Sequence, residues 1–150
     1  MKQDQKLRMA FQTMSEIAII GQLADNALRQ ALPETLSIAS FGVLNHFARL
    51  GVEGESPTKL ARAFQVTKGA MTYTLQQLEA LGFVTITDDP ADARAKVVRI
   101  TKAGVRAREA AIARVNPGMS RMLQVIPAEE FAAALPFLTR LREVMDAGRD

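Results

Sequence analysis

The sequence predicts a mainly α-helical, single-domain protein that carries one small β-hairpin. Three observations lead to this fold class. Apolar residues recur every three or four positions over most of the 150 residues, which is the spacing of one face of an α-helix. Between residues 83 and 101 this spacing gives way to two short runs rich in Val, Ile and Thr, which favour β-strands. Serine, threonine, proline and glycine stand where helices are expected to begin and end.

The first third of the chain predicts two helices. A near-heptad apolar seam runs from Leu7 to Ala31 and ends before Pro33. A second helix is expected to begin near Ser37, whose hydroxyl suits an N-cap, and to stop at Gly51. The seam of the first helix could pack inside the domain or against a partner chain, and its length favours the partner.

The middle of the chain predicts a short helix, a tight turn and a longer helix. Ser56 and Pro57 are typical of a helix start, and that helix should be over by Gln65. Thr67 caps the next helix, which Gly82 terminates. The apolar residues expected to face inward are Leu60, Ala61 and Phe64 on the short helix and Ala70, Met71, Leu75, Leu78 and Leu81 on the longer one. Together with Val66 in the turn, Leu60, Ala61, Met71, Leu75 and Leu78 are expected to lock the two helices together.

A hairpin and two more helices complete the prediction. Residues 83–87 and 97–101 are the expected strands, and residues 88–96 form a long tip that carries two cations. Thr101 can cap the following helix. Pro117 is expected to break or kink that helix, Pro127 to start the last one, and Pro136 to kink it.

Composition excludes several classes of function. The chain has no cysteine and a single histidine, which excludes disulfides and the usual zinc sites. No arrangement typical of acid–base or nucleophilic catalysis occurs, so we expect neither an enzyme nor a cofactor nor a metal. No apolar run is long enough to span a membrane, and no secretion signal is visible, so a cytoplasmic location is expected.

Charge concentrates in the middle of the chain. The net charge is +3, and between Pro57 and Arg106 eight basic residues accompany four acidic ones. A short helix, a turn, a longer helix and a cationic hairpin together have the layout of a winged helix-turn-helix, whose second helix enters the major groove of DNA. The residues expected to contact DNA are Lys68, Gly69, Thr72, Tyr73, Gln76 and Gln77 on the longer helix, with Arg94 and Lys96 on the hairpin.

Residues 36–104 resemble the MarR family of bacterial transcriptional regulators. The resemblance lies in the 36–44 segment, in Leu60 and Ala61, in the 66–84 segment, and most specifically in the hairpin sequence 89–94 and the Ile-Thr-Lys-Ala-Gly of 100–104. It implies a homodimer held together by the flanks, residues 1–33 and 105–150, that binds palindromic double-stranded operator DNA and regulates transcription, as a repressor. The chain has Ile86, Thr87 and Ala93 where the family commonly has basic residues, which predicts fewer phosphate contacts.

The resemblance also implies a small-molecule effector, an aromatic or amphipathic acid bound between the flanking helices and the winged segment. Without a thiol, peroxide sensing through cysteine is impossible. The candidate lining residues are Phe11, Met14, Phe41, His46, Phe47 and Arg49. Two alternatives stay open: a winged helix that binds protein, and a DNA-binding protein with no effector.

Overall fold

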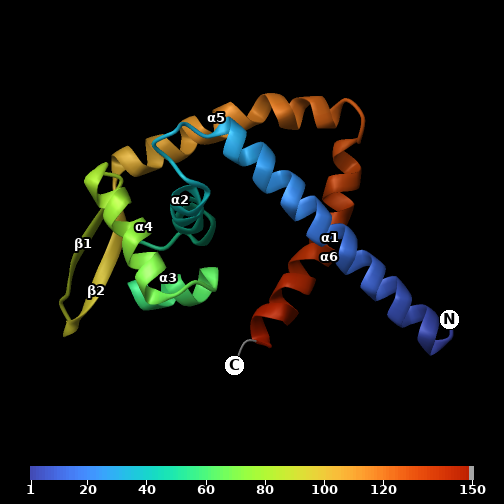
Figure 1. Ribbon diagram of the computed structural model, residues 1–150, viewed down its shortest axis with the longest axis horizontal. Helices are drawn as coiled ribbons and strands as arrows, with labels where there is room; N and C mark the ends of the chain where they lie inside the picture. Colours follow the sequence, from blue (N-terminus) through green and yellow to red (C-terminus); the bar gives the residue numbers. More distant parts are fainter. Residues whose placement is uncertain (149–150) are drawn as a thin grey trace. The chain divides into compact units, whose positions relative to one another are not determined.

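The computed structural model describes residues 1–148 and confirms the predicted mainly α-helical fold with one β-hairpin (Figure 1). Six helices and one antiparallel hairpin follow one another in that part of the chain. Their order is α1 (Gln3–Ala31), α2 (Ile38–Leu50), α3 (Pro57–Phe64), α4 (Lys68–Ala80), β1 (Val84–Asp89), β2 (Asp92–Ile100), α5 (Lys102–Leu123) and α6 (Ala128–Ala147). The chain divides into two compact units, Met1–Arg114 and Val115–Asp150, and the first contains α1 to α4, the hairpin and the beginning of α5.

The helix starts predicted from side-chain caps are confirmed. The hydroxyls of Ser37, Ser56 and Thr67 each accept a hydrogen bond from the backbone N–H three residues later, at 3.0–3.1 Å. These bonds satisfy N–H groups that have no partner inside the helix. At the other ends of α2 and α3, Gly51 and Gln65 adopt the left-handed conformation that terminates a helix.

The core of the first unit forms around α2. Val43, Leu44 and Phe47 are almost completely buried, and each such side chain stabilises the fold by about 1.5–3 kcal/mol. The other buried apolar residues are Leu32, Leu36, Leu60, Ala61, Met71, Leu75, Leu78, Val84, Val98 and Ala111. Arg108 of α5 adds a polar link, donating from Nε to Asn45 Oδ1 at 3.0 Å.

Three of the residues predicted to face inward are exposed instead. Val66 is 43% exposed, Leu81 is 40% exposed, and Ala70 also faces solvent. Val66 lies in the turn after the left-handed Gln65, where the helical period no longer decides which way a side chain points. The helix-turn-helix is therefore locked by Leu60, Met71 and their buried neighbours, without Val66.

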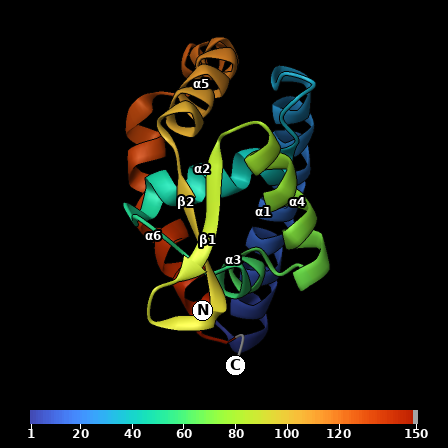
Figure 2. The same ribbon diagram turned by 90° about the vertical axis from the view of Figure 1, so that its left-hand side faces the viewer.

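The hairpin, called the wing below, has longer strands and a shorter tip than predicted. Pairing continues outward from Thr87–Val97 to Asp88–Lys96 and, after a shift in register, to Asp89–Asp92, so only Pro90 and Ala91 lie between the strands. The prediction of a long basic tip is wrong, because opposite charges face each other across the ladder at Asp88 and Lys96, and such pairs favour continued pairing. Figure 2 shows the wing beside α4.

Of the break or kink predicted at Pro117, the break is wrong and the kink stays a prediction. α5 runs through Pro117, and the chain turns only after Leu123. A proline removes one hydrogen bond from a helix, and the turns on either side hold the helix together. α6 likewise runs through Pro136 as one helix, which changes direction along its length (Figure 1). Pro127 caps α6, close to its predicted place at the start of this helix.

The wing is joined to α5 by a tight packing contact. Thr101 Oγ1 donates to the carbonyl oxygen of Gly82 at 2.6 Å and accepts from the N–H of Gly104 at 3.0 Å. The α-carbon of Gly104 lies so close to the residue before β1 that an added Cβ would stand 2.1 Å from the carbonyl oxygen of Phe83. The junction therefore needs a residue without a side chain.

Candidate nucleic-acid interface

Helix α4 has one buried face and one exposed polar face. Met71, Thr74, Leu75 and Leu78 are buried against the core. The six predicted DNA-contacting residues of α4 are all exposed on the other side, and we call them the polar face: Lys68, Gly69, Thr72, Tyr73, Gln76 and Gln77. A helix with this division can lie in a major groove while its apolar side stays in the protein.

Two members of the polar face contact each other. Gln77 Nε2 donates to the hydroxyl oxygen of Tyr73 at 3.0 Å, one helical turn apart. Tyr73 is 64% exposed, so its ring stands out from the helix with its hydroxyl held on the C-terminal side. The hydroxyl hydrogen of Tyr73 stays free to donate to a base edge or a phosphate.

The two wing cations predicted to contact DNA, Arg94 and Lys96, each lie near a carboxylate. Lys96 is paired with Asp88 across the strands, and Arg94 Nε lies 3.7 Å from Asp92 Oδ1. The side chain of Arg94 is 95% exposed, and this pairing is weak because water screens it. Of these two cations, Arg94 is therefore better placed to reach a phosphate, and Lys96 is held closer to the strand.

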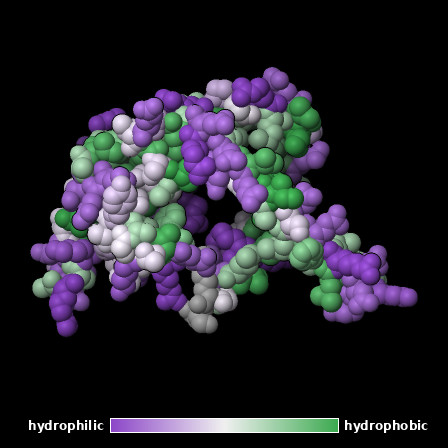
Figure 3. Space-filling view, in the orientation of Figure 1, coloured by the Kyte–Doolittle hydropathy of each residue, from purple (hydrophilic) through white to green (hydrophobic). Residues whose placement is uncertain are grey.

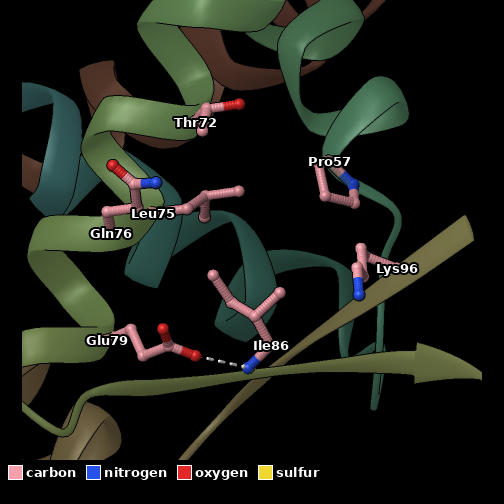
Figure 4. A pocket seen from close by; sticks show the side chains of 7 residues that line it. All are labelled: Pro57, Thr72, Leu75, Gln76, Glu79, Ile86 and Lys96. Atoms are coloured by element: carbon pink, nitrogen blue, oxygen red, sulfur yellow. Dashed lines mark hydrogen bonds between the residues drawn. The ribbon is translucent and has the colours of Figure 1, made fainter.

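A groove of about 280 Å³ separates α4 from the wing (Figure 4). At one end the Glu79 carboxylate of α4 accepts a hydrogen bond from the backbone N–H of Ile86 at 3.2 Å. The sequence alone does not predict this contact, because no local signal indicates it. The lining residues are Pro57, Thr72, Leu75, Gln76, Glu79, Ile86 and Lys96.

The six residues predicted to line an effector pocket lie on two helices, Phe11 and Met14 on α1 and the other four on α2. Phe47 and His46 are buried, Phe41 and Met14 are half-buried, and Phe11 and Arg49 are exposed. A second groove, of about 480 Å³, lies where α1 leads into α2, between Arg29 and Ala39. Neither groove is lined by any of the six.

His46 is a core histidine in this structure. Its ring lies 5.5 Å from that of Phe64, and burial lowers its pKa, with a further contribution from the nearby charge of Arg49. The ring is therefore neutral at pH 7. Within residues 1–148, no group of three or more His, Asp and Glu is arranged to hold a metal ion.

The fold and the polar face together define a winged helix-turn-helix protein. A MarR family model matches residues 35–95. Solved structures match over a longer span: the transcriptional regulator BldR from Sulfolobus solfataricus is 26% identical, with a TM-score of 0.73, over 93% of this chain and 99% of that one. No curated protein sequence matches significantly.

Two further structures were solved with bound molecules. A MarR variant from E. coli complexed with operator DNA is 26% identical (TM-score 0.67, 85% of this chain and 91% of that one). CouR from Rhodococcus jostii RHA1, bound to p-coumaroyl-CoA, is 28% identical (TM-score 0.66, 83% and 87%). Residues 35–95 thus match the MarR family model, and the chain as a whole has the fold of the MarR-family transcriptional regulators to which it is similar.

Proposed function

We propose that this protein is a repressor that binds palindromic operator DNA as a homodimer in the cytoplasm. The observation that carries the proposal is the polar face of α4, exposed on a rigid helix beside the wing. The E. coli relative solved with operator DNA has the same fold. Two copies related by a two-fold axis would place their α4 helices in successive major grooves, about 34 Å apart.

The test is a selection of bound duplexes from random DNA, followed by affinity measurements over a range of salt concentrations. We expect the selected duplexes to share an inverted repeat with half-sites about one helical turn apart. Affinity should fall steeply as salt rises, because phosphate contacts release counterions. A protein that selects no sequence and shows no salt-dependent duplex binding would favour a protein partner for the winged helix.

The homodimer is supported by the apolar side chains that α1 and α6 expose. Neither helix has a buried residue, and Phe11 of α1 is 74% exposed. Figure 3 shows hydrophobic side chains on the surface along α1, and Ile19, Ile20 and Leu23 are among the exposed residues of that helix. An apolar surface of this extent on a soluble chain usually marks an interface.

Sedimentation at micromolar concentration tests the dimer, with Ile20→Glu as the disrupting variant and Asp25→Ala on the same helix as the control. We expect a dimer for the natural chain and for the control, and a dissociated or unfolded chain for Ile20→Glu, since obligate interfaces bury about 2,000 Å² or more. A folded, monomeric natural chain would refute the proposal.

We further propose that an aromatic or amphipathic acid regulates DNA binding, with a site next to α1 and α2. CouR, a relative of the same fold, was solved with an aromatic acyl-CoA. Calorimetry with a panel of such acids, with and without operator DNA, tests this regulation. A tenfold loss of DNA affinity requires the ligand to prefer the DNA-free form by about 1.4 kcal/mol. Failure to bind across the panel would favour a DNA-binding protein without an effector.

A further inference from the structure

The contact between Glu79 and Ile86 ties the helix that carries the polar face to the wing. Glu79 Oε2 accepts from the backbone N–H of Ile86 at 3.2 Å, drawn as a dashed line in Figure 4. The two residues are seven positions apart and belong to different elements, α4 and β1.

The geometry of the hairpin makes that N–H available. Ile86 lies opposite Val98 in the ladder. On the other side of β2, the N–H of Val98 donates to the carbonyl oxygen of Glu55 at 2.8 Å, and the carbonyl oxygen of Val98 accepts from the N–H of Glu55 at 3.0 Å. In an antiparallel ladder, a pair whose groups turn away from each other alternates with a hydrogen-bonded pair. The N–H of Ile86 therefore points outward from the edge of β1, toward α4.

The contact lies at the outermost residue of β1 that packs against the core. Ile86 packs against the buried cluster, whereas Thr87 and Asp88, the next residues along β1, are exposed. Arg94 lies on the part of the wing that extends beyond this point. Among the residues that line the groove, Figure 4 draws one hydrogen bond, which joins Glu79 to Ile86.

The charge of Glu79 opposes DNA binding. It is the only acidic residue of α4, and a carboxylate near the polar face repels phosphates. A carboxylate at this place weakens DNA binding through its charge and strengthens it through its hydrogen bond, so the two effects have opposite signs.

We propose that Glu79 is a positioning residue for DNA binding, whose hydrogen bond to the Ile86 N–H holds the wing at a fixed angle to α4. Arg94 and the polar face can then contact the same duplex at the same time. Binding avoids the conformational-entropy cost of ordering a mobile wing. This role rests on the proposed function, since it presumes that α4 and the wing bind the same DNA.

Two substitutions separate the hydrogen bond from the charge. Glu79→Gln removes the charge and keeps an oxygen that can accept from Ile86, so we expect affinity for operator DNA equal to or higher than that of the natural chain. Glu79→Ala removes both, and we expect about five- to tenfold weaker binding than for Glu79→Gln, the size of one lost hydrogen bond. Glu53→Gln and Glu53→Ala, on an exposed loop, are the matched controls and should not differ from each other.

Combining each variant with Arg94→Ala gives the decisive measurement. Arg94→Ala should weaken binding in the natural and Glu79→Gln backgrounds, and much less in the Glu79→Ala background, where the wing is no longer held. Hydrogen exchange of the Ile86 amide should be faster in Glu79→Ala than in Glu79→Gln, while the thermal midpoints confirm that both fold.

Each outcome decides the proposal. Equal affinities of the Gln and Ala variants, or an effect of Arg94→Ala that is the same in all backgrounds, refute the role of Glu79 while DNA binding by the natural chain upholds the proposed function. A natural chain that binds no duplex refutes the proposed function and the role of Glu79 with it.

Discussion

Replacing Gly104 with alanine sets local helix propensity against tertiary packing. Gly104 lies in the first turn of α5, and alanine within a helix is favoured over glycine by up to about 1 kcal/mol, so propensity alone predicts a more stable protein. In the structure, however, the new Cβ would lie 2.1 Å from the carbonyl oxygen of Phe83 and 2.9 Å from Cγ1 of Ile100. The first of these atoms belongs to the backbone and cannot rotate away.

The magnitude follows from the two opposing effects. Overpacking costs about 1–3 kcal/mol, and the backbone clash places Gly104→Ala at about the upper end. Subtracting the gain in propensity leaves a net loss of about 2 kcal/mol. For a chain of this length that corresponds to a thermal midpoint lower by about 4–8 °C.

Thermal unfolding followed by circular dichroism measures the effect, at one fixed protein concentration so that any contribution of association to the midpoint is the same for every variant. Gly118→Ala is the matched control, since it lies in the same helix and its new Cβ would meet nothing closer than Arg121 Nη2 at 3.9 Å. We expect the control to be unchanged or more stable by up to about 1 kcal/mol. A Gly104→Ala protein as stable as the control would refute the packing argument.

Three further predictions concern DNA binding and pH. Tyr73→Ala and Gln76→Ala should each relax base preference at particular operator positions by about 1–3 kcal/mol, and loss of affinity that is equal for all sequences would contradict base contact. Arg94→Ala should weaken binding to all sequences alike and reduce the salt slope by about one unit, and an unchanged slope would remove Arg94 from the interface. The lowered pKa of His46 means that the unfolded chain takes up a proton more readily than the folded one, so stability is greatest above pH 6.5 and falls as the pH decreases below it. In His46→Gln, the free energy of unfolding measured with denaturant should fall less as the pH decreases. A pH profile identical to that of the natural chain would show that other groups dominate the pH dependence of stability.

Much of the candidate interface could be predicted from the sequence because its signals are local. The capping hydroxyls of Ser56 and Thr67 lie within three residues of the N–H groups that they satisfy. The division of α4 into a buried and a polar face follows from the helical period alone. The side that Val66 faces could not be predicted in this way, because it lies in a turn that has no period.

The wing shows what local signals leave out. The pairing of Lys96 with Asp88 extends the strands and partly neutralises the charge of Lys96. The sequence alone does not reveal this partner. The hydrogen bond from Ile86 to Glu79 depends on which way one N–H points in the ladder, and that is set by the pairing of Val98 with Glu55 on the far side.

The sequence by itself determined the order of helices and strands, the places where most of them begin, and the residues that α4 turns to solvent. Caps, breakers and apolar periods act within about one helical turn, so they can be recognised without the fold. Only the tertiary structure decided the length of the wing, the continuity of α5 through Pro117, the absence of space at Gly104 and the role open to Glu79. Each of these depends on atoms that come together from different elements, where chain geometry and packing, rather than the neighbouring residues in the sequence, fix what touches what.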